Sequence, residues 1–138
     1  HLEHLLDVPP LLLEAEAVRE RDRALVVARH SRTGRRVAVL GEMLELGPEG
    51  GGLHRQSGQH MAANGIDILI GVRGLAKAMV EAARQAGMQA EFVATPEEAG
   101  EWLAREARDG DVVLLKASRG VKLERALETW KARRTTGN

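Results

Sequence analysis

The sequence VVLLKASRG at residues 112–120 is the stretch from which the fold is inferred most directly. Its four apolar residues in succession predict a buried strand, and Gly110 and Asp111 in front of it favour a turn. Lys116 and Arg119 follow where the strand should end and where helical spacing begins. A strand followed directly by a helix is the repeating unit of an open α/β sheet.

The end of this stretch has the chemistry of an anion site. Ligands of open α/β sheets bind outside the carboxyl ends of the strands, where a following helix presents free N–H groups and a partial positive charge. Lys116 and Arg119 would add two full charges there, which suits a carboxylate or a phosphate. Solvated cations at the end of a sheet are the other interpretation, and these nine residues leave both open.

Residues 35–138 alternate between strand and helix patterns. Further strands are predicted at 36–40, 66–70 and 90–94, and helices at 53–64, 75–86, 96–108 and 121–134. Residues 48–52, PEGGG, are predicted to form a flexible loop between the first strand and the first helix. This order predicts a three-layer α/β fold: a mainly parallel sheet of Rossmann-like βα repeats with helices on both faces.

Residues 1–34 form an atypical N-terminal segment in front of the predicted α/β domain at 35–138. Pro9 and Pro10 could begin a helix, and the apolar residues after them keep approximately helical spacing, so we predict a helix here. A short strand at 25–28 is the alternative.

The composition excludes several classes of function. Twenty basic and twenty acidic residues cancel, so no basic excess indicates nucleic acid or a membrane surface as a partner. The absence of cysteine excludes disulfides and thiolate metal sites and fits a reducing, cytoplasmic compartment. No apolar run reaches the roughly 20 residues of a membrane helix, and no signal peptide is recognised.

Two predicted loops should lie at one edge of the sheet. Residues 41–43, Gly-Glu-Met, follow the first strand, and residues 116–120 follow the last, and the carboxyl ends of parallel strands share an edge. Glu42 could face an amine while Lys116 and Arg119 face a carboxylate, so this edge could bind a zwitterion. A solvated acid, or a charge at the start of a helix, is an equally open interpretation of Glu42.

Metal and nucleotide motifs are missing from the sequence. His54 and His60 are six residues apart, which is the wrong spacing for a metal-binding pair on one helix. His54 could face the same sheet edge, although a histidine that caps or solvates a helix end is more common. Neither a G-x-G-x-x-G nor a G-x-x-x-x-G-K-[ST] motif occurs. We therefore predict no metal site in this chain and leave cofactor-binding residues unassigned.

Three stretches together resemble the C-terminal domain of the Mur ligases. They are VLGEMLELG at 39–47, His54 with Gly58, and GDVVLLKASRG at 110–120, and the resemblance extends over about residues 35–130. Ala117 stands where this family usually has glycine. The family begins this domain with a D-[S/D]-Y-N-A-N-P stretch that approaches ATP. This chain has no tyrosine and its first asparagine is Asn64, so the first 34 residues are divergent, tag-derived or read in an altered frame.

The resemblance implies an ATP-dependent ligase of peptidoglycan-precursor synthesis with three domains, of which this would be the last. In such a ligase ATP phosphorylates the carboxylate of UDP-N-acetylmuramoyl-tripeptide, and the amine of D-alanyl-D-alanine attacks the acyl phosphate with the help of Mg²⁺. The central domain would bind most of the ATP and Mg²⁺. This chain alone would then be inactive, would bind ATP weakly and would carry no catalytic residue of its own.

The resemblance also implies a substrate-binding set. One group of residues would hold the carboxylate of the dipeptide or the phosphates, and a second group would line the same cleft. The first group is Lys116, Ser118 and Arg119, and the second is Glu42, Met43 and His54.

Two other classes of protein remain open. One is a stand-alone Rossmann-like module that binds a small ligand or docks a subunit without catalysis, which a gene lacking a central ligase domain would favour. The other is a fragment with an unpaired sheet edge that self-associates, which light scattering would reveal.

Overall fold

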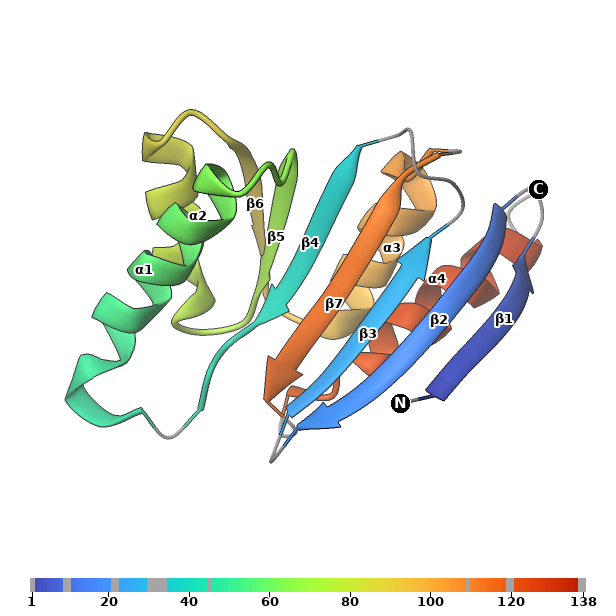
Figure 1. Ribbon diagram of the computed structural model, residues 1–138, viewed down its shortest axis with the longest axis horizontal. Coiled ribbons are helices and arrows are strands. Elements are labelled where there is room, and N and C mark those ends of the chain that lie inside the picture. The colour runs from blue at the N-terminus through green and yellow to red at the C-terminus, as the bar shows by residue number, and fades with distance from the viewer. Residues whose placement is uncertain are drawn as a thin grey trace.

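A computed structural model describes residues 2–8, 11–20, 23–29, 35–44, 46–108, 110–118 and 121–136. Within these ranges seven strands form one sheet in the order β1-β2-β3-β7-β4-β5-β6 (Figure 1). The strands are β1 (Leu2–Val8), β2 (Leu11–Glu20), β3 (Arg23–Arg29), β4 (Arg36–Gly41), β5 (Ile68–Val72), β6 (Gln89–Val93) and β7 (Val112–Ser118). The α-helices are α1 (Gly50–Ala63), α2 (Ala76–Gln85), α3 (Pro96–Glu106) and α4 (Glu124–Thr136), and a 3₁₀ turn, η1 (Gly47–Glu49), precedes α1.

The half of the sheet made by β7, β4, β5 and β6 confirms the predicted α/β fold. These four strands are parallel, and each of β4, β5, β6 and β7 is followed by a helix. Figure 1 shows α1 and α2 on one face of the sheet and α3 and α4 on the other. The carboxyl ends of the four strands therefore lie at one edge, as the sequence predicted.

The helix predicted within residues 1–34 is wrong. The described parts of this segment form β1, β2 and β3, which are antiparallel to one another and extend the sheet beside β7. In β2 small or apolar residues alternate with glutamates, which is a strand period that the approximate helical spacing concealed. Without β3, β7 would be an open sheet edge, and pairing along its whole length favours the strand. The alternative of a strand at 25–28 is confirmed, whereas the origin of the segment and the domain division at residue 35 stay predictions.

The flexible loop predicted at 48–52 is also wrong. Pro48 lies in η1, where its fixed φ suits a first turn, and α1 begins directly afterwards at Gly50. A Cβ at Gly50 would lie 2.9 Å from Leu75 Cδ1, so the glycine allows Leu75 to pack against the start of α1. Packing of this turn against the start of α2 therefore overrides the flexibility that three consecutive glycines suggest.

The core lies in two layers, one on each face of the sheet. Successive strand residues alternate between faces, so Val37 and Val39 pack toward α3 and α4, whereas Ala38 and Leu40 pack toward α1 and α2. Because both faces of the sheet are covered, the central strands are continuously apolar. Such apolar runs allowed these strands to be predicted from the sequence. Trp102 and Leu103 of α3 and Ala126 and Trp130 of α4 all lie in the core layer between these helices and the sheet.

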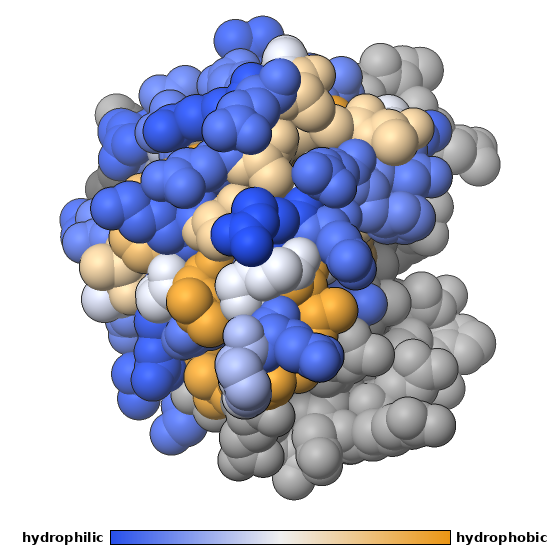
Figure 2. Space-filling view, turned by 90° about the vertical axis from the view of Figure 1, so that its left-hand side faces the viewer, coloured by the Kyte–Doolittle hydropathy of each residue, from blue (hydrophilic) through white to orange (hydrophobic). Residues whose placement is uncertain are grey.

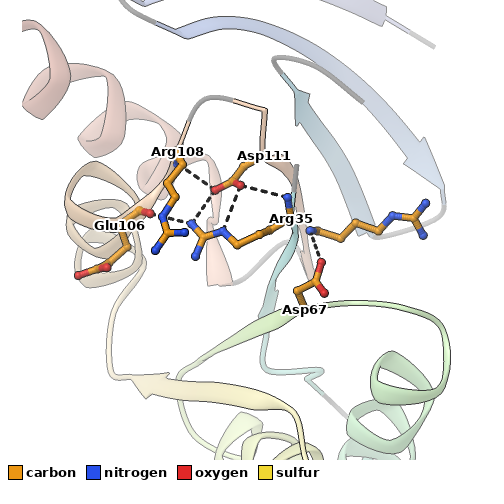
Figure 3. Close-up of polar contacts among 6 residues, drawn as sticks. Arg35, Asp67, Glu106, Arg108 and Asp111 are labelled. Atoms are coloured by element: carbon orange, nitrogen blue, oxygen red, sulfur yellow. Dashed lines mark hydrogen bonds and ion pairs between the residues drawn. The ribbon is translucent and has the colours of Figure 1, made fainter. Parts of the chain in front are cut away.

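The amino ends of β4 and β7 are joined by a polar cluster around the buried side chain of Asp111 (Figure 3). Asp111, whose side chain is 4% exposed, accepts hydrogen bonds from Arg35 Nε at 3.2 Å, Arg35 Nη2 at 2.8 Å and the backbone N–H of Arg108 at 2.9 Å. Arg35 Nη2 also donates to the carbonyl of Glu106 at 2.8 Å. The hydrogen bond with Asp111 raises the pKa of Arg35. This cluster lies at the edge of the sheet opposite to the predicted site and fixes the start of both strands.

Candidate functional site

The candidate site lies at the carboxyl edge, by which we mean residues 41–44, 72–75 and 116–118 at the ends of β4, β5 and β7. Gly41 is paired with Val72 of β5, and Leu40 with Lys116 of β7. The backbone N–H of Glu42 continues this pairing by donating to Val72 O at 2.9 Å. Residues 41–43 and the described part of the second predicted loop, 116–118, therefore lie at one edge. The latter residues belong to β7 itself, and residues 119 and 120 lie outside the described part of the chain.

Glu42 acts at the start of α2. Its Oε2 accepts a hydrogen bond from the backbone N–H of Leu75 at 3.0 Å, and its Oε1 lies 3.6 Å from Arg73 Nε. The side chain is only 16% exposed. Gly74, with a φ of +51°, has no room for a Cβ because the Glu42 carboxylate lies against it. Of the interpretations of Glu42 left open by the sequence, a charge at the start of a helix matches this geometry, and a ligand amine would have to compete with Arg73 and Leu75.

Met43 and His54 are brought together by a backbone hydrogen bond. The N–H of Met43, which is half-buried, donates to His54 Nε2 at 2.9 Å. His54 lies on α1, is completely buried, and its Nδ1 is 2.6 Å from the carbonyl of Gly50. Both ring nitrogens of His54 thus have hydrogen-bond partners within the chain. His54 links α1 to the backbone of Met43 at the carboxyl edge.

Lys116 occupies the last part of β7. Val113 and Leu115 belong to the core layer under α3 and α4, so strand alternation directs Lys116 to the opposite face, on the same side as its register partner Leu40. Lys116 is partly exposed. The backbone of Ser118 ends β7, while its side chain and the whole of Arg119 lie outside the residues that the structure describes.

Arg73 is a residue of the carboxyl edge to which sequence reasoning gave no role. It directly follows β5, its side chain is 50% exposed, and it forms the ion pair with Glu42. Its backbone has a φ of 77°, and the other described non-glycine residue with positive φ, Lys122 at 58°, follows β7. Left-handed backbone at non-glycine residues is uncommon and concentrates at functional sites. The rule that identified Lys116, a cation at the end of a parallel strand, would also have identified Arg73.

The surface beside this edge is mixed in polarity. Figure 2 shows the side of the molecule covered by α1 and α2, which is largely hydrophilic, with apolar residues gathered in its lower part. Leu75, at the start of α2, is 44% exposed. Among the described residues no cluster of three or more His, Asp or Glu side chains could hold a metal ion.

Taken together, these features define a Rossmann-like α/β domain that carries Glu42, Arg73 and Lys116 at the carboxyl edge of its parallel strands. The family model described as Mur ligase, glutamate ligase domain, matches residues 16–119. The chain therefore belongs to the Mur ligase family, which confirms the resemblance inferred from the sequence. The matched region begins within β2 and thus includes part of the N-terminal segment, for which the sequence had predicted a helix.

Two solved structures of ligases named MurF resemble this chain. The MurF ligase of Thermotoga maritima, in complex with ADP, is 28% identical with a TM-score of 0.61, over 78% of this chain and 24% of the ligase. MurF of Acinetobacter baumannii is 24% identical with a TM-score of 0.64, over 73% of this chain and 23% of the ligase, and supports the fold. The chain thus spans about a quarter of the length of these ligases.

Proposed function

We propose that this chain is the C-terminal domain of an ATP-dependent ligase that joins D-alanyl-D-alanine to UDP-N-acetylmuramoyl-tripeptide through an acyl phosphate. The observation that carries the proposal is the 28% identity and common fold with the Thermotoga MurF ligase over 78% of the chain. The ADP bound to that ligase supports the use of ATP by a longer protein containing this chain. We expect the isolated chain to be inactive.

In this proposal the carboxyl edge holds the incoming dipeptide. Lys116, together with the nearby Ser118 and Arg119, would bind the carboxylate of D-alanyl-D-alanine through charge-assisted hydrogen bonds. Met43 would line the same cleft, and Glu42 would hold Arg73 and the start of α2 in place behind it. Such contacts would place the amine of the dipeptide for attack and so reduce the entropy cost of reaching the transition state.

ATP and Mg²⁺ are assigned mainly to the central ligase domain. The sequence of this chain has no phosphate loop, and among its described residues no cluster of three or more His, Asp or Glu side chains could hold a metal ion, which supports this assignment. The partners of the chain would be the N-terminal and central ligase domains, with no nucleic acid or membrane partner. The nucleotide-linked substrate indicates a cytoplasmic location, and no helix among the described residues has the length and apolar character to cross a membrane.

A genetic test separates this proposal from a stand-alone binding module. The gene should be sequenced for about a thousand bases upstream of the codon for Arg35, a span comparable to the two domains expected in front. A G-x-x-x-x-G-K-[ST] motif in that region would support a ligase. A stop codon and a promoter directly upstream would instead indicate a stand-alone module.

A substitution in the longer ligase tests the site. Lys116→Ala should raise the KM for D-alanyl-D-alanine by about tenfold or more, because the loss of a hydrogen bond to a charged group costs roughly 1.5–3 kcal/mol. Arg105→Ala, an exposed cation at the end of α3, is the matched control and should leave the KM unchanged. Equal KM values for wild type and Lys116→Ala would remove Lys116 from the dipeptide site.

A further inference from the structure

We propose that His54 is a positioning residue: as its neutral Nδ1–H tautomer it fixes the backbone of residues 42–44 at the carboxyl edge. The consequence for catalysis rests on the proposed ligase function. The structural part of the proposal concerns only this chain and is tested separately.

The two hydrogen bonds of His54 determine its tautomer. The Gly50 carbonyl can only accept a hydrogen bond, so Nδ1, 2.6 Å away, carries a proton. The Met43 N–H can only donate, so Nε2, 2.9 Å away, carries none. Neither the other neutral tautomer nor the imidazolium can make both bonds, and complete burial leaves no solvent to replace them.

The 42–44 segment is held at three successive residues, and His54 supplies the contact from α1. Glu42 is held by its backbone bond to Val72 and by its carboxylate at the start of α2. Leu44 packs against the core layer under α3 and α4. Met43 lies between them, and its N–H is the group directed toward α1. Loss of the His54 acceptor would therefore release the middle of a segment whose two ends are held by other elements.

The position of this segment matters because it connects two groups at the carboxyl edge. Glu42 bonds the start of α2 and pairs with Arg73, and β4 carries Leu40 beside Lys116. Because Met43 adjoins Glu42, a shift of the Met43 backbone would strain the contacts that hold Glu42 and Arg73 in position relative to β7. His54 would thus act on dipeptide binding through backbone geometry and would not touch the substrate.

The first experiment uses this chain alone. Long-range ¹H–¹⁵N NMR should show the His54 ring with a protonated Nδ1 and an unprotonated Nε2 at neutral pH, and the Met43 amide should exchange slowly with solvent. The His54 signals are identified by their loss in His54→Gln. An Nε2–H tautomer or an imidazolium at neutral pH would overturn the proposal.

The second experiment compares two variants with the same missing ring. In His54→Gln the side-chain carbonyl can accept from Met43 N–H, whereas His54→Leu fills similar volume without an acceptor. Leucine should reduce protection of the Met43 amide from exchange by about tenfold or more, and glutamine should restore most of it. His60→Gln, on the exposed last turn of α1, is the control and should leave protection of the Met43 amide unchanged. Equal Met43 protection in the leucine and glutamine variants would contradict the proposal even if both are less stable.

In the longer ligase, His54→Leu should raise the KM for D-alanyl-D-alanine by about tenfold while changing kcat by less than about threefold, with rescue by glutamine. If His54 had a purely structural role, His54→Leu would lower the amount of active enzyme and leave the KM unchanged. That result would overturn the claim that His54 affects dipeptide binding. A longer protein without ligase activity would refute the proposed function, while the tautomer and Met43 protection would still decide the role of His54.

Discussion

At the scale of the residue, Asp111 is a buried hydrogen-bond acceptor whose removal should lower the stability of the chain. Asp111→Ala would leave Arg35 and the Arg108 N–H without their acceptor. Because Arg35 is 25% exposed, the cost should lie below the roughly 3–5 kcal/mol of a fully buried pair. Urea unfolding monitored by circular dichroism measures the change. Arg133→Ala, which removes an exposed ion pair of similar length, should cost less than about 0.5 kcal/mol. Similar losses in the two variants would show that the Arg35–Asp111 cluster is not important for stability.

The Arg35–Asp111 contact also predicts how Arg35 responds to pH. Its pKa is raised in the folded state, so its contribution to stability is complete below the unfolded pKa and is lost only when the pH rises through the folded value. Both values lie far above neutral pH. The difference in unfolding free energy between wild type and Arg35→Ala should therefore be the same at about pH 7 and pH 9. A difference that shrinks toward pH 9 would contradict this assignment.

The sequence predicted which charged residues lie at the carboxyl edge, but it did not predict which groups their side chains contact. The positions of Glu42 and Lys116 follow from strand order and the rule that parallel strands end together. The pairing of Glu42 with Arg73 depends on the positive φ of Arg73 and on the missing side chain at Gly74. Hydrophobic periodicity reveals neither feature. The sequence therefore suggested a ligand amine as the partner of Glu42, whereas in the fold the Glu42 carboxylate contacts Arg73 and the N–H of Leu75.

At the scale of the element, α1 and α2 approach each other at Gly58. A Cβ on Gly58 would overlap with the carbonyl of Met79 in α2. Gly58→Ala should thus destabilise the chain by about 1–3 kcal/mol, although alanine is the better helix former. Gly52→Ala, with no atom closer than 4.0 Å to the new Cβ, should be neutral or stabilising by up to about 1 kcal/mol. Thermal unfolding of the two variants tests the pair, and equal effects would show that α1 and α2 do not pack closely there.

The start of α3 at Pro96 agrees with the helix predicted at 96–108, because the determinants of this helix start are local. Thr95 Oγ1 accepts from the backbone N–H of Glu98 at 3.1 Å, and Pro96 takes the first helical position. Thr95→Ala should cost about 1 kcal/mol, measurable as a lower urea midpoint with an unchanged slope. Thr95→Ser, which keeps the hydroxyl, should cost less, and equal losses would contradict the cap.

The misassigned elements depend on distant contacts. The strands β1–β3 form because β7 provides an edge to pair with, and nothing within residues 1–34 encodes that edge. Likewise, the helical start at Gly50 depends on packing against Leu75, which lies 25 residues away in the sequence. Central strands buried on both faces carry a strong local signal, and elements stabilised from outside carry a weak one.

At the scale of the whole molecule, the chain should bind ATP weakly by itself. It lacks a phosphate loop, and the proposed function assigns ATP to the central domain. Isothermal titration calorimetry with Mg–ATP should show no binding with a Kd in the micromolar range, so any binding free energy should be weaker than about −4 kcal/mol, the value for a Kd of about 1 mM. Micromolar binding would require a nucleotide site in this chain and would contradict the division of roles.

The most direct test of the account is a ligase assay of the longest protein encoded in frame with this chain. Phosphate release should be measured with ATP, Mg²⁺, UDP-N-acetylmuramoyl-tripeptide and D-alanyl-D-alanine, omitting each in turn. We expect phosphate release to require all four components. The Lys116→Ala variant should reach the wild-type rate of phosphate release only at about tenfold higher dipeptide concentration. Phosphate release that is independent of the dipeptide, or no release by the folded protein, would contradict the account.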